Sequence, residues 1–275
     1  MLITVRDLYK IYRVGQSRVF ALNGVSFSVE KGEFCAIVGT SGSGKSTLLN
    51  LLAGLEPPTK GYININNKII NKMSENELVA FRRDHVGFVF QSFNLLQGMT
   101  AVENVALPLS FQGEERYTRE LKAKKMLTYV GLKSHLNHKP NEMSGGQQQR
   151  VGIARALVVQ PDIIFADEPT GNLDSKTSAD IMQLIRSISK QNGQTVIMVT
   201  HDQELAQYAD RIFDIRDGKI IGISKGKYRT GTSESTETAK TALTAEQKKI
   251  KDQDIKQTIK DQDIKQTIKD QDIKK

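Results

Sequence analysis

The sequence predicts an α/β fold with a parallel sheet core, an antiparallel β subdomain and a helical subdomain. The core follows from four short apolar runs, each followed by a loop and a helix-like segment, which is the pattern of buried parallel strands. These runs are residues 34–38, 86–90, 163–167 and 196–200. Residues at the carboxyl ends of such strands point at the ligand crevice of a doubly wound sheet.

Two changes of pattern predict the other subdomains. Alternating apolar and polar residues in three further runs predict an antiparallel sheet beside the core. These runs are residues 3–5, 25–29 and 62–65. Residues from about 92 to 150 are helical in pattern, with 120–130 the clearest amphipathic stretch. Asp217-Gly218, between two strand-like runs, is a hairpin signal that closes the domain.

A glycine-rich loop follows the first core run and matches the phosphate-binding pattern G-x-x-x-x-G-K-[ST]. Its glycines let backbone N–H groups approach phosphate oxygens, and the N-terminus of the helix-like run after it adds partial positive charge. Lys45 can reach the outer phosphates, and the Ser46 hydroxyl can ligate Mg²⁺. The predicted nucleotide-binding residues are Gly39, Thr40, Ser41, Gly42, Ser43, Gly44, Lys45, Ser46 and Thr47.

A second glycine pair lies in the segment from Met143 to Gln147. Ser144 and Gln147 have the spacing of a capping box that opens a helix, and the glycines between them leave bare amide groups at its positive end. The segment resembles the signature peptide of ATP-binding cassette (ABC) ATPases, with Met143 where Leu is commoner. The nucleotide-binding residues that it adds are Ser144, Gly145, Gly146 and Gln147.

Further elements occur in the order that the ABC family requires. Residues 163–168 form an apolar strand ending in two carboxylates and resemble the Walker B motif followed by the catalytic glutamate. The resemblance implies that Asp167 holds Mg²⁺ through water and that Glu168 polarises the attacking water. Residues 169–174 resemble the D-loop region, with Asp174 as its acid, which we count among the nucleotide-binding residues.

Three single residues complete the resemblance. His201, after the run 196–200, resembles the switch histidine that contacts the γ-phosphate. Gln91 resembles the Q-loop glutamine, which contacts the metal and the attacking water and links the ATP site to the membrane partner. Tyr12 matches the aromatic A-loop position that stacks on adenine, although an isolated tyrosine is more often an ordinary surface or core residue.

The resemblance implies a complete ATPase subunit. It covers about residues 1–225, so we assign residues 1–227 to an ABC cassette with a RecA-like, P-loop NTPase core and a helical subdomain at about 92–150. Two cassettes would form a homodimer that sandwiches two ATP molecules. Each site would combine residues of one subunit with Ser144 and Gly146 of the other. The residues from the first subunit would be Lys45, Ser46, Gln91, Glu168 and His201.

Composition is consistent with this prediction. The net charge of +8 suits phosphate binding and an inner membrane leaflet, and no nucleic-acid-binding motif accompanies it, so we expect no nucleic-acid partner. No apolar run approaches the ~20 residues that cross a bilayer, and the first residues lack the apolar centre of a signal peptide. We expect a peripheral subunit on the cytoplasmic face of the cell membrane, with Cys35 as a small buried hydrophobe.

Residues 228–275 are predicted to be a disordered low-complexity tail. A nine-residue repeat begins at Ile250 and recurs at Ile259 and Ile268. Its isoleucines alternate in spacing between five and four residues, which keeps no persistent face on a helix or a strand. A neutral repeat expansion is the favoured interpretation, and a partner-binding role is the alternative.

The subclass is indicated by residues 166–175, and above all by Gly171-Asn172 where many importers of polar solutes have Ser-Ala. This segment looks like the MacB/LolD-like class of macrolide exporters and lipoprotein-releasing systems. The implied partner is a separate integral membrane permease with a large extracytoplasmic domain, used for export, efflux or peptide resistance. Alternatives are a cell-division ATPase that regulates cell-wall hydrolases and, less favoured, a non-transport cassette protein.

Overall fold

Two sheets and the helices around them form the cassette in the computed structural model, which describes residues 1–228. The predictions for the repeat tail lie outside the described residues. The six-stranded sheet has the order β10 (Lys219–Lys225), β9 (Arg211–Arg216), β3 (Phe34–Val38), β8 (Thr195–Thr200), β7 (Ile163–Asp167) and β6 (Val86–Phe90). Strands β9, β3, β8, β7 and β6 are parallel, and only β10 pairs antiparallel. The predicted α/β class and parallel core are therefore confirmed.

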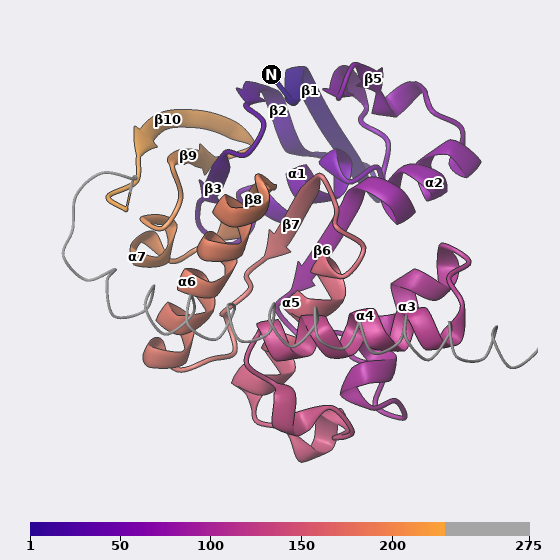
Figure 1. The fold of residues 1–275 in the computed structure, drawn as a ribbon. Coiled ribbons are helices and arrows are strands. Elements are labelled where there is room, and N and C mark those ends of the chain that lie inside the picture. Colours follow the sequence, from indigo (N-terminus) through magenta and orange to yellow (C-terminus); the bar gives the residue numbers. More distant parts are fainter. Residues whose placement is uncertain (229–275) are drawn as a thin grey trace, which may run out of the picture. The chain divides into compact units, whose positions relative to one another are not determined.

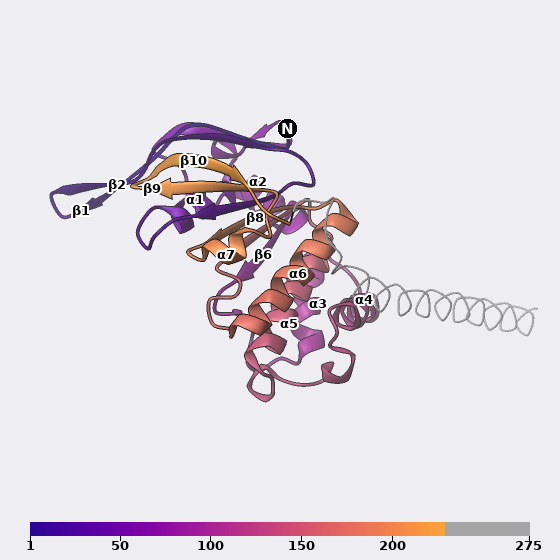
Figure 2. The same ribbon diagram turned by 90° about the vertical axis from the view of Figure 1, so that its left-hand side faces the viewer.

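The second sheet is antiparallel, as expected from the alternating runs. Its order is β2 (Ser17–Val29), β1 (Ile3–Val14), β4 (Lys60–Ile65) and β5 (Lys68–Ile69). Strands β1 and β2 extend well beyond the predicted runs and form a long hairpin (Figures 1 and 2). The tip of this hairpin, at residues 13–14 and 17–20, is exposed on both strands, so the apolar alternation on which the prediction depended is absent there.

Seven α-helices lie in the described residues. They are α1 (Lys45–Leu52), α2 (Glu75–His85), α3 (Ala101–Phe111), α4 (Arg116–Tyr129), α5 (Gly145–Leu157), α6 (Ser175–Asn192) and α7 (Gln203–Ala206). Short 3₁₀ turns are η1 (Ile70–Lys72), η2 (Lys133–His135) and η3 (Pro140–Glu142). Helices α3 and α4 fall inside the predicted helical segment and lie at the end of the cassette away from β1 and β2 in both ribbon views (Figures 1 and 2). Our sequence analysis did not predict α2.

The six-stranded sheet is buried on both faces, which explains why its strands are continuous apolar runs. Phe34, Ala36 and Val38 belong to one apolar cluster, with α3, α5 and α6. Cys35 and Ile37 belong to another, with α1 and the antiparallel sheet. Burial raises the pKa of the Cys35 thiol to about 12, with the nearby Glu33 carboxylate acting in the same direction, so Cys35 is a buried hydrophobe, as predicted.

A capping box determines where helix α5 begins. The Ser144 side chain accepts a hydrogen bond from the N–H of Gln147, and the Gln147 side chain accepts one from the N–H of Ser144. This confirms the predicted capping box of α5.

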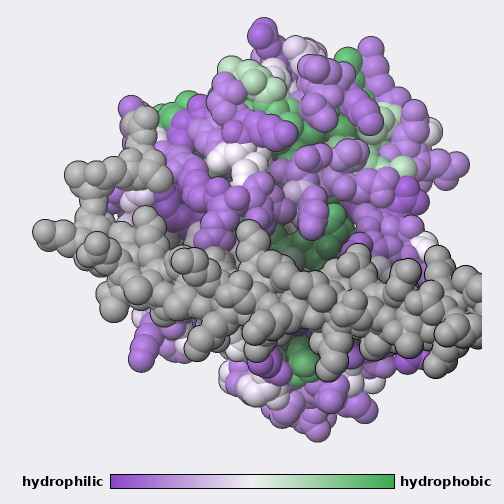
Figure 3. Space-filling view, viewed as in Figure 1, coloured by the Kyte–Doolittle hydropathy of each residue, from purple (hydrophilic) through white to green (hydrophobic). Residues whose placement is uncertain are grey.

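The visible face of the cassette is mainly hydrophilic, with apolar residues in separate patches (Figure 3). No helix in residues 1–228 has the length and apolarity of a membrane span.

The last described residues are tied back to the core. The ring of Tyr228 stacks on Tyr208, with centroids 4.6 Å apart, and Arg186 of α6 donates to the carbonyl oxygens of both tyrosines. The N–H of Tyr228 donates to the carbonyl oxygen of Gln207. Tyr228, although half-exposed, is therefore anchored to the core by its ring and its backbone.

We expect two truncated chains, one ending at Tyr228 and one at Lys225, to differ in stability. A chain that ends at Tyr228 should retain the free energy of unfolding of the full chain, whereas one that ends at Lys225 should lose about 1–3 kcal/mol because the aromatic stack and its hydrogen bonds are absent. Urea unfolding of the three chains measures this difference. Equal stability of the two truncated chains would contradict the proposed anchor.

Candidate functional site

The phosphate-binding loop connects β3 to α1 and encloses the Lys45 ammonium. Its Nζ donates to the carbonyl oxygens of Gly39 and Thr40, each at 2.8 Å, and the side chain is buried. Gly44 has φ 101°, and a Cβ there would lie 2.3 Å from the carbonyl oxygen of Ala21. The loop therefore requires glycine at this position, and the Lys45 ammonium and the loop N–H groups are the parts of it that can bind a phosphate.

Asp167 at the end of β7 lies opposite the start of α1. Its Oδ1 accepts from the Ser46 hydroxyl at 3.5 Å, a long contact. Burial, and then the charge of Glu168, raise the pKa of the Asp167 carboxyl above its usual range. A carboxylate and a hydroxyl held apart at this spacing suit a hard cation that takes further oxygen ligands from phosphates. The described residues contain no cluster of three or more acidic, histidine or cysteine side chains that could hold a metal alone.

Glu168 and His201 follow two adjacent strands and meet there. His201 Nδ1 donates to Glu168 Oε2 at 3.0 Å, and the N–H of Glu168 donates to the carbonyl oxygen of Val199 at 3.0 Å. Glu168 has φ 42°, a left-handed conformation that costs a non-glycine residue about 1–3 kcal/mol. The ladder bond to β8 holds this backbone, and the side chain consequently points toward the histidine rather than along the strand.

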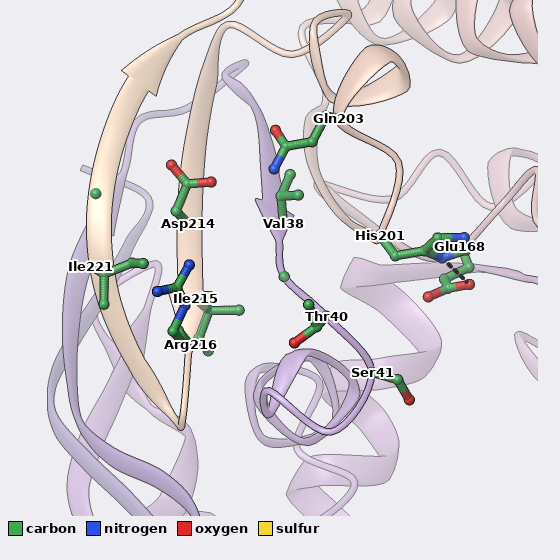
Figure 4. Close-up of a pocket in the computed structure, with 12 residues that line it drawn as sticks. Val38, Thr40, Ser41, Glu168, His201, Gln203, Asp214, Ile215, Arg216 and Ile221 are labelled. Carbon is green, nitrogen blue, oxygen red and sulfur yellow. Dashed lines mark hydrogen bonds and ion pairs between the residues drawn. The ribbon is translucent and has the colours of Figure 1, made fainter.

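A cavity of about 860 Å³ opens beside the loop. Figure 4 shows Thr40 and Ser41 between a wall of β9 and β10 side chains and the pair of Glu168 and His201. Lys45, Ser46, Asp167 and Gln91 do not line it. Three further polar residues line the cavity and are not predicted from the sequence, since none belongs to a nucleotide motif. Asp214 and Arg216 lie on β9, and Gln203 begins α7.

Gln91 is exposed after β6 and touches the segment that follows β7. A Cβ on Gly171 would lie 2.7 Å from its Nε2, so the Gln91 amide occupies the space that a side chain at position 171 would need. Asn172 Nδ2 donates to the carbonyl oxygen of Gln91 at 3.0 Å. The subclass signal Gly171-Asn172 therefore has a structural role in holding Gln91, which the sequence pattern alone did not reveal.

The predicted signature residues contact a different part of the chain. A Cβ on Gly145 would meet Leu173 and Phe93, and one on Gly146 would lie 2.6 Å from the methyl group of Thr177. The described contacts thus join this segment to the region after β7, not to the phosphate loop. Gln147 also receives support from His135, whose Nε2 lies 3.1 Å from its amide nitrogen.

Asp174 has a capping role in this structure. Its carboxylate accepts from the N–H of Thr177 at 3.0 Å and opens α6, and hydrogen bonds to Thr177 hold its pKa below the usual range. The place of Asp174 among the nucleotide-binding residues stays a prediction.

Tyr12 lies away from the loop on β1 but close to α1. Its hydroxyl donates to Glu56 Oε2 at 2.8 Å. Burial, and then the Glu56 carboxylate, raise the pKa of this phenol, while Thr47 of α1 acts in the opposite direction. The structure therefore brings Tyr12 beside the helix that the phosphate loop opens.

A phosphate loop after one parallel strand and an acid pair after another define the class of P-loop nucleoside triphosphatases. Comparison with known proteins then identifies the family. Residues 22–171 match the model of the ABC transporter family, so the chain belongs to that family and contains its ATP-hydrolysing cassette.

Relatives and solved structures agree with this assignment. The chain is 49% identical over 222 residues to the uncharacterized ABC transporter ATP-binding protein MJ1508 of Methanocaldococcus jannaschii, covering 81% of this chain and 99% of that protein. It is 47% identical to the macrolide export protein MacB of a Shewanella species over 80% of this chain, but this match spans only 34% of that protein. The chain also resembles the dimeric post-hydrolysis structure of the cassette MJ0796 with ADP and Pi, with a TM-score of 0.76 and 44% identity. This match covers 81% of this chain and 98% of that chain.

Asp167 should make the nucleotide-free protein less stable at neutral pH. Because its folded pKa is raised above the unfolded value of about 3.9, the folded state binds the proton more tightly, and stability falls as pH rises through the interval between the two values. Asp167→Asn should therefore raise the free energy of unfolding at pH 7, with a smaller gain as pH falls toward 4.

Urea unfolding without nucleotide, from pH 7 to pH 4, measures this effect. The matched control is Asp180→Asn, which changes an exposed acid on α6. A loss of stability in Asp167→Asn at pH 7 would be inconsistent with a raised pKa for this carboxyl.

Proposed function

We propose that this cassette binds ATP with Mg²⁺, closes as a homodimer, and powers a separate permease of a MacB/LolD-like exporter. The proposal of ATP hydrolysis depends on the 3.0 Å contact between His201 and Glu168. His201 follows β8, the strand next to β3, from which the Lys45 loop begins. These groups lie at the carboxyl edge of parallel strands, where a nucleoside triphosphate binds in such sheets.

Different residues of this chain bind the phosphates, orient the attacking water and hold Mg²⁺ in the proposed reaction. Lys45 and the loop amides bind the outer phosphates, and the helix start of α1 adds its dipole. Glu168 accepts a hydrogen bond from water and orients it toward the γ-phosphate, while His201 holds the Glu168 carboxylate and faces the same phosphate. Mg²⁺ would be held by Ser46 and Asp167, with Gln91 nearby, and it supplies charge neutralisation of the phosphate oxygens.

A second copy of the chain completes the proposed site. Ser144 and Gly146 lie at the positive end of α5, with contacts to the region after β7 but none described to the phosphate loop of the same chain. In a head-to-tail pair this helix end would face the nucleotide of the other subunit. The dimeric structures of the similar cassette MJ0796, one of them with ADP and Pi, support the pairing of two copies.

The permease partner and its class are proposed from relatives. The match to MacB proteins, of which the chain spans 34%, and the Gly171-Asn172 segment support an exporter with an integral membrane permease as its partner. The net charge of +8 suits a position beside an anionic leaflet, on the cytoplasmic side. A cell-division ATPase remains the alternative, and reconstitution with each candidate permease distinguishes them.

Glu168→Gln should retain ATP binding but lose most hydrolysis, by about 10²–10⁴-fold, because only the activation of water is impaired. The ATP-bound dimer should accumulate. Phosphate release and light scattering with ATP measure the two effects, and Lys45→Ala, which weakens nucleotide binding itself, is the contrasting variant. Hydrolysis by Glu168→Gln at the parent rate would exclude Glu168 as the activating carboxylate.

The Glu168→Gln variant also allows a test of the nucleotide site that two subunits are proposed to share. Gly146→Asp should abolish the ATP-bound dimer, because a carboxylate would face polyphosphate, while monomeric ATP binding changes little. Gly146→Ala is the matched control, since it adds the same Cβ beside Thr177 without charge. If Gly146→Asp still dimerised with ATP, the signature segment would not contact the partner's nucleotide.

Leu96 is the better candidate for a permease contact after Gln91. From their place between the predicted core and the helical subdomain, we expect Leu95 and Leu96 to lie at this contact, and burial in the core is the alternative. Leu95 is 8% exposed and belongs to the apolar core, whereas Leu96 is 45% exposed. The alternative is therefore correct for Leu95, and the coupling role is kept for Leu96 alone.

We expect Leu96→Ala to reduce permease-stimulated ATPase activity several-fold with a smaller effect on basal turnover and on the melting temperature. Leu95→Ala should instead lower stability by about 2–4 kcal/mol because it opens a cavity in the core. ATPase assays with and without the permease, beside thermal unfolding, separate the two. Equal stimulation of Leu96→Ala and the parent would place the permease contact elsewhere.

A further inference from the structure

Tyr12 is held by a network that no sequence motif includes. Its hydroxyl donates to Glu56 Oε2 at 2.8 Å, and the same oxygen accepts from Lys10 Nζ at 3.0 Å. Lys10 Nζ also donates to the carbonyl oxygen of Pro57 at 2.9 Å and lies 5.1 Å from the centre of the Tyr12 ring. One carboxylate thus fixes the tip of the ring, and one ammonium covers a face of it.

The network also reaches the helix that follows the phosphate loop. Asn50 of α1 donates to Glu56 Oε1 at 3.4 Å, so the two oxygens of this carboxylate contact β1 on one side and α1 on the other. The backbone supports the same junction, because Ile11 N–H donates to Thr59 Oγ1 at 3.0 Å and Thr59 N–H to the carbonyl oxygen of Tyr9. Tyr12 is therefore fixed relative to the phosphate-binding helix.

The charges in the network are balanced. The Lys10 ammonium, as the main cause, holds the pKa of Glu56 below its usual range, so the carboxylate stays ionised at neutral pH. The Lys10 side chain is 13% exposed and that of Glu56 32%, which makes this pair less screened than an ordinary surface pair. Without Lys10, a carboxylate at this place would repel a triphosphate.

We propose that Glu56 and Lys10 are positioning residues for the nucleotide base, which hold the Tyr12 ring as a platform at a fixed distance from the phosphate loop. Lys10 covers one face of the ring, so a planar base stacks on the opposite face. The inference rests on the proposed role of Tyr12 in base binding. It adds that base affinity is controlled from the loop after α1, by a residue that never touches the nucleotide.

Stacking energy depends on the orientation of the ring, so loosening the ring weakens the base contact and leaves the phosphate contacts intact. A merely structural network behaves differently. Its loss would weaken all ligands of the folded site together, or lower stability without selectivity. The two cases are separated by comparing ATP with a ligand that has phosphates but no base.

The experiment uses the full chain and titration calorimetry with Mg²⁺ and either ATP or inorganic tripolyphosphate. We expect Glu56→Ala and Tyr12→Phe each to raise the Kd for ATP about 3- to 10-fold, and Tyr12→Ala about 10- to 100-fold. The Kd for tripolyphosphate should stay within about twofold of the parent in all three, because the phosphate loop is unchanged. In turnover, KM for ATP should rise more than kcat falls.

Three further variants sharpen the test. Glu56→Gln keeps an oxygen acceptor for the Tyr12 hydroxyl and should recover most of the ATP affinity lost in Glu56→Ala. The double variant Tyr12→Phe/Glu56→Ala should be no weaker than either single one, because both remove the same bond. Lys60→Ala removes a comparable lysine contact, 5.7 Å from the ring centre of Tyr9 on the same sheet, and should leave ATP affinity unchanged.

The outcomes distinguish the inference from the proposed function. If Tyr12→Ala weakened ATP binding but Glu56→Ala and Tyr12→Phe did not, the base platform would stand and the positioning role would be wrong. If Tyr12→Ala left the Kd for ATP unchanged, Tyr12 would not bind the base at all. Equal weakening of ATP and tripolyphosphate by Glu56→Ala, or additive effects in the double variant, would also overturn the positioning role.

Discussion

The buried ammonium of Lys45 is the constraint on which the site depends. A lysine charge that is removed from water is costly unless it is paired, and here two backbone carbonyl oxygens at 2.8 Å provide only dipoles. The loop around it tolerates no side chain at two of its glycines. A Cβ on Gly39 would lie 2.4 Å from the carbonyl oxygen of Ile215, and one on Gly44 would meet the carbonyl oxygen of Ala21. The loop that holds this charge is thus packed against β9 at Gly39 and against β2 at Gly44.

The opposite charges lie at the ends of the neighbouring strands. Strand β8 lies between β3 and β7, so His201 is placed between the phosphate loop and the two acids after β7. Burial, and then the charge of Glu168, raise the pKa of Asp167, so its ionised form is held at an energetic cost, and the left-handed φ of Glu168 adds backbone strain. Both costs are typical of groups whose proper counterpart is a ligand rather than the protein.

Local signals made much of this predictable. The loop glycines, the capping box at Ser144 and the strand that ends in Asp167 are patterns of consecutive residues, and each lies where the sequence placed it. What escaped prediction depends on contacts between distant segments. Glu56 at the hydroxyl of Tyr12 and Asn172 on the carbonyl oxygen of Gln91 join residues far apart in the chain, and neither contact can be read from the local pattern around its residues. The division between Leu95 and Leu96 escaped prediction for another reason: the irregular loop after β6 has no period from which burial can be read.

These long-range contacts make the loop after Gln91 part of a connected unit. Phe93 and Asn94 are consecutive residues in the left-handed region, and Arg155 of α5 donates to the carbonyl oxygens of both. Burial lowers the pKa of Arg155, yet the guanidinium stays charged because its ordinary value is so high. Helix α5 begins at Ser144, and its Gln149 donates to the carbonyl oxygen of Phe90 at the end of β6. Gln149 in the first half of this helix and Arg155 near its C-terminus therefore both bind the backbone on either side of Gln91, which joins this loop to the helix that the signature segment opens.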